Sequence, residues 1–236
     1  MVDYENGGLG TAPKFPQPMA QEFLLKYYSR TRDHQSLQIV LMTLDRMARG
    51  GIYDQIGGGF HRYSTDQFWL IPHFEKMLYD NALLSSLYLH AFQITGWPEH
   101  RLIVEETLDY VLREMTDLSG GFYSTQDADS EGEEGLFFSW TLEECERAVG
   151  SEQMNLLTTY YGLTSTGNFE GRNILSVPAP HKLLAAEIGI SEIALDQAIQ
   201  NIKTQMLAVR NQRIPPMRDE KILTSWNVLM IRSFAE

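Results

Sequence analysis

The stretch from residue 57 to residue 81 contains the side chains of this chain that are best suited to chemistry. Behind a triple glycine at 57–59, His61 and His73 stand among carboxylates, basic groups and aromatic rings. Imidazole titrates near neutral pH, so either histidine can act as a general acid or base. Such a density of reactive side chains beside a permissive glycine loop is typical of a pocket wall.

Two interpretations of the histidines remain open. In the first, His61 or His73 removes a proton from the carbon next to a sugar carbonyl. The orienting or acidic groups are then four carboxylates: Glu75, Asp80, Asp127 and Asp129. In the second interpretation, both histidines are structural and bond to loop backbone.

The acidic run over residues 126–135 has three interpretations. Its oxygens alternate as in a calcium loop, but Phe138 stands where such a loop needs a bidentate glutamate, so we expect no metal. One aspartate of the run facing Glu75 or Asp80 would instead form the carboxylate pair of a glycosidase. The glutamates of the run, Glu134 among them, fit a solvated turn.

Aromatic and polar residues complete the predicted cavity. Trp69 and Trp226 stand beside polar residues, which favours them as platforms for the apolar face of a sugar ring. Arg62 and Lys76 would hold hydroxyls or an anionic group, although an ion pair with Glu75 or Asp80 explains Lys76 equally well. The full predicted substrate wall is Arg62, Tyr63, Trp69, Lys76, Tyr79, Asn81, Trp140, Trp226 and Asn227.

Composition excludes several classes of protein. The chain has 236 residues, a net charge of −12 and a pI near 4.9, which disfavours nucleic acid as a partner because phosphate binding needs clustered cations. The sequence has no membrane-spanning apolar run and no signal peptide, so we expect no membrane partner and a cytoplasmic protein. Cys145 is the only cysteine, and its acidic neighbours make it a poor nucleophile. We expect no cofactor.

Apolar residues recur mostly at helical spacing. The pattern predicts helices over residues 19–30, 34–49, 74–94, 98–115, 141–149, 151–160, 182–188, 191–209 and from 223 onward. Because the third of these would open at His73, it would place Glu75 and Lys76 one turn before Tyr79 and Asp80. Two short strands, 122–124 and 136–140, are expected around the acidic turn.

A short internal repeat follows two of the predicted helices. Gly50-Gly51-Ile52-Tyr53 after the second helix is echoed by Gly120-Gly121-Phe122-Tyr123 after the fourth. Helical hairpins that repeat with glycine loops on one side indicate an all-α fold of the α/α toroid type. We expect the toroid to be incomplete, to carry a small β-hairpin insert, and to hold its cavity at the loop end.

Two strings in the reactive stretch resemble the spermatogenesis-associated, thioredoxin-domain-containing family. They are Gly-Gly-Phe-His-Arg-Tyr-Ser at 58–64 and Pro-His-Phe-Glu-Lys-Met-Leu-Tyr-Asp-Asn at 72–81. Ala-Pro-Lys-Phe-Pro at 12–16, the acidic run at 126–135 and the segment 219–227 support the resemblance. These motifs span nearly the whole chain, in order.

The resemblance implies a fold and a set of functions. Members carry a thioredoxin-like domain followed by a toroid similar to N-acylglucosamine 2-epimerase and cellobiose 2-epimerase, in the six-hairpin glycosidase-like group. Residues 1–236 would then form a single partial toroid domain, without the thioredoxin-like domain and the remaining helices.

Three functions follow as expectations. The first is proton transfer of the sugar epimerase or isomerase kind in carbohydrate metabolism. The second is glycoside hydrolysis by paired carboxylates, and the third is a non-catalytic scaffold working with a thioredoxin-like domain. The expected partner is a carbohydrate or other polyol, and exposed apolar helix faces would pair two copies into a homodimer.

Overall fold

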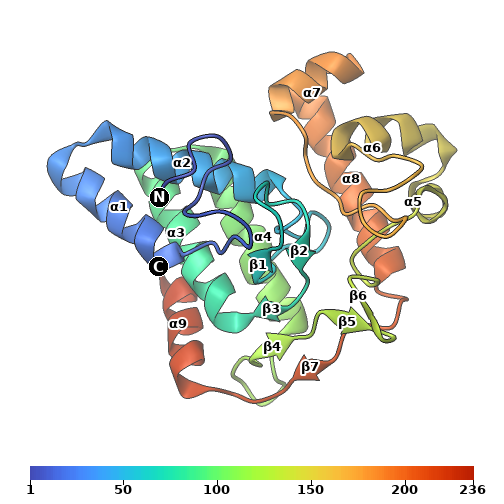
Figure 1. Ribbon diagram of the computed structural model, residues 1–236. Coiled ribbons are helices and arrows are strands. Elements are labelled where there is room, and N and C mark those ends of the chain that lie inside the picture. The colour runs from blue at the N-terminus through green and yellow to red at the C-terminus, as the bar shows by residue number, and fades with distance from the viewer.

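The computed structural model describes residues 1–236 and is mainly helical (Figure 1). Its α-helices are α1 (Pro18–Thr31), α2 (His34–Arg49), α3 (Leu78–Thr95), α4 (Pro98–Glu114), α5 (Leu142–Val149), α6 (Met154–Tyr161), α7 (His181–Ile188), α8 (Glu192–Arg210) and α9 (Thr224–Ala235). A short 3-10 helix, Ser151–Gln153, precedes α6. The all-α class is therefore confirmed, and each predicted helix is present.

Local signals explain where several helices begin and end. Pro18 and Pro98 open α1 and α4, where the missing N–H of proline is no loss. The Asp33 side chain caps α2 by accepting from the Ser36 amide at 3.1 Å. Gly96, with φ of 71°, closes α3 in the left-handed conformation.

Helix α3 is the centre of the larger half of the molecule. It packs against α1, α4 and α9, and α1 packs against α2, so that two helical hairpins and α9 form an open arc (Figure 1). Its mean hydropathy is high and it is buried on most sides. The core of this half comes from α1–α4 and the loop between α2 and α3, including Val40, Leu44, Leu84 and Tyr88.

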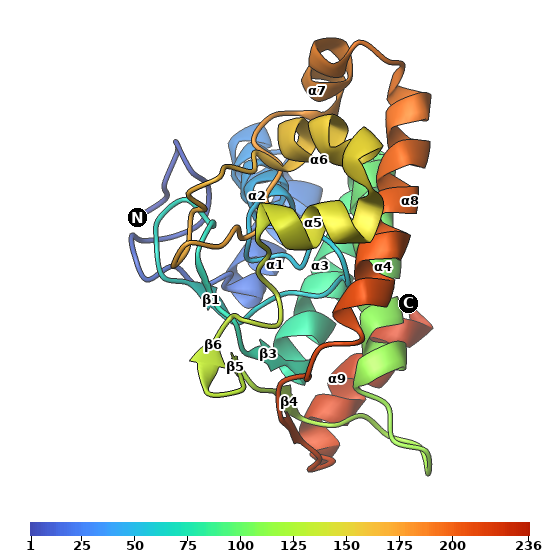
Figure 2. The same ribbon diagram turned by 90° about the vertical axis from the view of Figure 1, so that its right-hand side faces the viewer.

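A second core lies among α5, α6, α7 and α8. It contains Trp140, Cys145, Leu157, Leu195 and Met206, all fully buried. Burial, and then the charge of Glu144, raises the pKa of the Cys145 thiol to about 12, which keeps it a thiol. Figure 2 shows α8 running alongside α4, where Lys203 donates to Glu106 at 2.6 Å.

Very short strands bring the starts of α3 and α9 to one end of the arc. β1 (Tyr63–Ser64) pairs with β2 (Pro72–His73), and Lys14 just before α1 bridges to Ser64. β3 (Lys76–Met77), β4 (Thr125–Gln126) and β7 (Arg218–Asp219) form a ladder in that order. Because β3 leads into α3 and β7 precedes α9, the first turns of α3 and α9 meet there. We call this the loop end.

Two sequence expectations at the loop end are wrong. Residues 72–77 are not helical, because β2 and β3 pair with β1 and β4, and α3 begins only at Leu78. The expected pairs of Glu75 with Tyr79 and of Lys76 with Asp80 on one helix therefore do not form.

The strands expected at 122–124 and 136–140 are also wrong. The hairpin forms inside the acidic run, between β5 (Asp129–Ser130) and β6 (Glu133–Glu134). Its two-residue turn is Glu131-Gly132, with φ of 57° and 84°, the combination that lets two strands reverse tightly.

The expected internal repeat is wrong in its first copy, because the turn that matches Gly120-Gly121-Phe122 lies at Gly58-Gly59-Phe60 and not at Gly50-Gly51. In both copies two glycines with positive φ precede a phenylalanine, whereas Gly50 is extended. Asn81, the fourth residue of α3, binds both the amide and the carbonyl of Phe60. Asn227, the fourth residue of α9, binds Phe122 in the same way. Each asparagine thus clamps a glycine-phenylalanine turn to a helix start.

Candidate active site

His61 is one of the two predicted proton-transfer residues, and the structure places it in the interior. Its Nδ1 donates to the carbonyl oxygen of Phe74 at 2.8 Å, and the residue is 2% exposed. Burial, together with the Lys76 charge, lowers its pKa to about 3. The cavity it lines has a volume of about 20 Å³, room for a water molecule and not for a sugar. This placement matches the structural interpretation.

Lys76 also lies inside, where it belongs to a buried ion cluster. Its Nζ lies 2.8 Å from Asp54, whose second oxygen accepts from Arg210 at 2.8 Å. Burial raises the pKa of Asp54, but the Arg210 and Lys76 charges outweigh it and hold that pKa well below its usual range. The Lys76 ammonium lies 4.2 Å from the centre of the Tyr110 ring. We call Asp54, Lys76 and Arg210 the ion centre.

Four further predicted wall residues have structural contacts. Asn81 and Asn227 are the clamps of the two glycine-phenylalanine turns. Trp69 is fully buried and donates from its indole to the carbonyl of Asn6 at 3.0 Å. Trp140 is fully buried in the second core. None of these side chains faces solvent.

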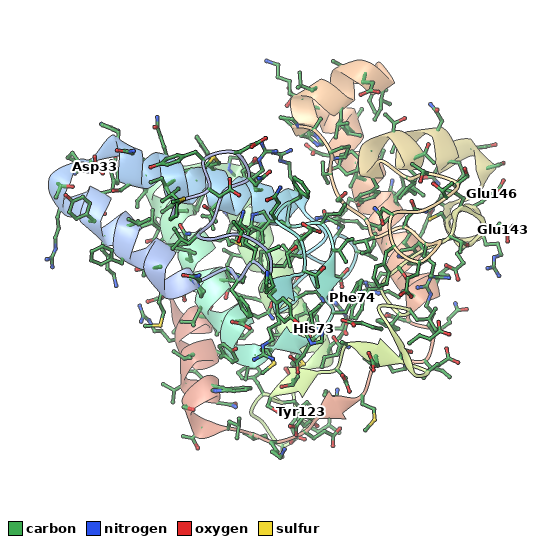
Figure 3. The ribbon with its side chains drawn as sticks, in the orientation of Figure 1. Asp33, His73, Phe74, Tyr123, Glu143 and Glu146 are labelled. Carbon is green, nitrogen blue, oxygen red and sulfur yellow. The ribbon has the colours of Figure 1, made fainter.

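The other predicted residues between positions 62 and 80 meet at the loop end. Arg62 donates to Glu75 at 3.0 Å, and His73 Nε2 lies 3.7 Å from the same oxygen of Glu75. Tyr63 stacks on the His73 ring, with centroids 5.1 Å apart and planes inclined by 29°. All four side chains are half-buried, and Figure 3 shows His73 beside the short strands near the start of α3.

Asp80 is the most perturbed carboxyl of this group. It lies in the first turn of α3, is 8% exposed, and its Oδ2 has no hydrogen-bond partner. Burial raises its pKa from 3.8 to about 7, although the charge of Arg62 and a hydrogen bond from Tyr79 lower it. Glu75 adds a smaller upward contribution. A carboxyl that titrates near neutral pH can donate or accept a proton under ordinary conditions.

An aromatic pair lies next to Asp80. Tyr79 on α3 and Trp226 on α9 have ring centroids 4.8 Å apart, and both are half-buried. The pair exists because the β3-β4-β7 ladder brings the two helix starts together. We define the loop-end site as Arg62, His73, Glu75, Tyr79, Asp80 and Trp226.

A groove lies on the face shared by α1, α3 and α9, and no residue of the loop-end site lines it. Its volume is about 70 Å³. Leu83, Ser86 and His90 line it from α3, on the same helical face as Tyr79. The remaining lining residues are Pro18, Met19, Glu22, Lys26, Ala82, Leu229 and Arg232.

The predicted aspartates of the acidic run lie on the surface. Asp127 and Asp129 are exposed, and Asp127 accepts from the Ala128 amide at 2.7 Å. Glu134, which the sequence assigns to a solvated turn, instead contacts His73 at 2.7 Å. Only the hairpin fold of the acidic run brings it there, and no local pattern signals that contact.

The arrangement as a whole suits acid–base chemistry. It joins one carboxyl with a pKa near neutral, one carboxylate paired with arginine, one imidazole and two aromatic rings.

No helix is both long enough and apolar enough to cross a membrane.

Comparisons with known proteins give relatives of the whole chain. A scan against protein-family models finds no match. Human spermatogenesis-associated protein 20 is 38% identical over 99% of this chain, and the mouse protein of that name is 39% identical over the same share. In both cases the match covers 33% of the relative, so the chain spans about a third of its length.

Two solved structures are similar at low sequence identity. Cellobiose 2-epimerase from Bacillus thermoamylovorans is 12% identical, with a TM-score of 0.47, over 99% of this chain and 76% of that one. A family 76 glycoside hydrolase from Bacteroides thetaiotaomicron is 14% identical, with a TM-score of 0.45, over 94% of this chain and 42% of that one. The sequence resemblance is confirmed, since nearly the whole chain is homologous to one third of spermatogenesis-associated protein 20.

Proposed function

We propose that the loop-end site binds a carbohydrate or similar polyol and exchanges a proton with it, as sugar epimerases and isomerases do. The observation that carries this proposal is Asp80, a buried carboxyl with a pKa of about 7 and an unpartnered oxygen, set beside an aromatic pair. Strongly perturbed carboxyls of this kind concentrate at functional sites. A core residue with no chemical task would normally be apolar or fully hydrogen-bonded.

The proposed reaction uses two groups of the site. Asp80 in its protonated form donates its proton to the carbonyl oxygen of the open-chain sugar. His73 Nε2 accepts the proton from the adjoining carbon, and that C–H electron pair forms the carbon–carbon double bond of an enediol. Once the enediol has turned its other face to His73, the proton returns to that face of the carbon, the oxygen proton goes back to Asp80, and the product is the epimer.

Substrate binding falls to the other members of the site. Tyr79 and Trp226 present rings that suit the apolar face of a sugar. Arg62 has a buried Nε without a hydrogen-bond partner, in addition to the Nη1 that donates to Glu75. A sugar hydroxyl is a suitable acceptor for it.

Deuterium incorporation tests the proposal directly. The chain is incubated with reducing mono- and disaccharides in heavy water, and deuterium at the carbon next to the carbonyl is followed by NMR. Asp80→Asn should lower the rate by about 100-fold or more, the usual contribution of a general acid or base. Asp109→Asn, an exposed aspartate on α4, is the matched control and should keep the full rate.

Glycoside hydrolysis is a second candidate, favoured by the pairing of two unlike carboxyls. Burial raises the pKa of Asp80 to about 7, while Glu75 is paired with Arg62. Two carboxyls in such different environments are typical of glycosidases. Product mass separates the candidates, since hydrolysis adds water and epimerisation conserves mass. Binding of sugars without conversion, or no binding at all, would favour the non-catalytic scaffold.

A further inference from the structure

We propose that Glu134 is a positioning residue that keeps the proton of the neutral His73 ring on Nδ1, so that the lone pair of Nε2 faces the loop-end site. This inference rests on the proposed function, because it gives His73 the role of exchanging a proton with substrate through Nε2. The inference is based on a hydrogen bond between the side chains of Glu134 and His73, which lie far apart in sequence. Nothing in the local pattern of the acidic run predicts it.

The imidazole of His73 is held at one nitrogen and on one ring face. Glu134 Oε1 lies 2.7 Å from His73 Nδ1, and the same oxygen accepts from the Phe74 amide at 3.3 Å. Tyr63 covers one face of the ring, and is itself stacked on Phe15 at 4.7 Å. His73 Nε2 points to the remaining side, 3.7 Å from Glu75.

The chemistry of the partner decides the tautomer. An ionised carboxylate only accepts hydrogen bonds, so the proton of the neutral imidazole sits on Nδ1 when Glu134 is its partner. Nε2 is then the lone-pair nitrogen, free to take a proton from a substrate. In activated acid–base pairs the base is generally oriented by a third group in this way. Without Glu134, both tautomers are populated, and the fraction of His73 in the reactive tautomer falls.

The fold places Glu134 against His73 through the small hairpin. The Glu131-Gly132 turn reverses the chain tightly, so that β6 returns toward β2. Gly135 follows with φ of 75°, and a Cβ there would lie 2.3 Å from the Phe74 ring. The hairpin thus rests directly on Phe74, the residue after His73, which brings the Glu134 side chain to the imidazole.

If the contact between Glu134 and His73 were purely structural, a different result would be expected. The Glu134 side chain is 44% exposed and that of His73 is 28% exposed. Ion pairs exposed to this degree contribute little to folding stability. If the pair only attached the hairpin, its loss would have a small effect on stability and no specific effect on the ring. The other charged groups around the imidazole, Glu75 and its partner Arg62, are unchanged by a substitution at Glu134.

The experiment compares Glu134→Gln with Glu133→Gln. Glu133 is the exposed neighbour on β6 whose side chain makes no hydrogen bond or ion pair, so the two variants change charge equally. Nitrogen-15 spectra of the neutral His73 imidazole report which nitrogen carries the proton. We expect the Nδ1-protonated form in the wild type and in Glu133→Gln, and a mixture of tautomers in Glu134→Gln. An unchanged tautomer in Glu134→Gln overturns the proposal.

Kinetics supply the second readout. Glu134→Gln should lower kcat on the order of 10-fold with KM unchanged. This loss is smaller than the 100-fold or greater rate enhancement that acid–base catalysis contributes, because His73 itself is still present. Glu134→Asp, which keeps the carboxylate, should recover part of that loss. The tautomer is measured without substrate, so a wild type that converts no sugar refutes the proposed function while still testing Glu134. Full kcat in Glu134→Gln refutes the positioning role alone.

Discussion

Asp80 makes the free energy of unfolding depend on pH, and this dependence can be measured without any substrate. Its pKa is about 7 in the folded chain and 3.8 in the unfolded reference, so the folded state holds the extra proton between these values. The free energy of unfolding therefore falls as pH rises from about 4 to about 7, by roughly 3 kcal/mol from this group. Asp80→Asn, which cannot ionise, should lack that decline.

Urea unfolding at pH 4 and pH 8 tests this prediction. The stability of Asp80→Asn relative to wild type should increase between the two pH values, because other titrating groups cancel in the comparison. An equal change in both proteins would mean that Asp80 is ionised in the folded state at neutral pH. The same result would remove the acid from the proposed reaction.

Gly135 is the residue on which the attachment of the β5–β6 hairpin depends. Gly132→Ala and Gly135→Ala both place a side chain at positive φ, which costs about 1–2 kcal/mol. A Cβ at Gly132 meets open space, whereas one at Gly135 meets the Phe74 ring. Gly135→Ala should therefore cost about 1–3 kcal/mol more than Gly132→Ala in thermal or urea unfolding. Equal costs would show that the hairpin does not rest on Phe74.

At the scale of elements, the helices could be predicted because their signals are local. The apolar period of residues 34–49, together with the Asp33 cap, gives the bounds of α2. The strands could not be predicted, because each is two residues long and exists only through its partner. The start of α3 was misjudged for that reason, since residues 72–77 pair with strands elsewhere in the chain.

The distinction between local signals and contacts that span the chain also applies to the loop-end site. The strings at 58–64 and 72–81 include most of the loop-end site, and Arg62, His73, Glu75 and Asp80 gather there. The sequence does not separate these from Lys76, because the Lys76 partner Asp54 lies in another loop. Glu134 was missed because its contact spans 61 positions of the chain.

For the whole molecule, the ion centre joins the two cores. Asp54 belongs to the loop after α2 and Arg210 ends α8, so their contact ties the second core to the first. Asp54→Asn leaves two buried cations without a counter-ion and should cost on the order of 3–5 kcal/mol. Lys76→Met leaves the Asp54–Arg210 pair intact and should cost less than half as much. Urea midpoints that rank Lys76→Met as the more harmful change would contradict this account.

The open arc leaves apolar side chains exposed on α1 and on α9. On α1, Met19, Phe23 and Tyr27 are 75%, 65% and 45% exposed, and on α9, Val228 and Ile231 are 58% and 59% exposed. Uncovered stripes of this kind favour association. We predict concentration-dependent self-association in sedimentation equilibrium, reduced by Phe23→Glu and unaffected by Gln38→Glu on α2. A chain that stays monomeric at all concentrations would refute it.

The two asparagine clamps have a consequence for motion. The amides of Phe60 and Phe122 lie in glycine loops, yet each donates to a buried asparagine at 2.7 Å. Their protons should exchange with solvent as slowly as those of a central helix, since release requires the first turn of α3 or α9 to open. The irregular loops under the reactive side chains would then be stiff supports, and the acid–base groups would keep their spacing through thermal fluctuation.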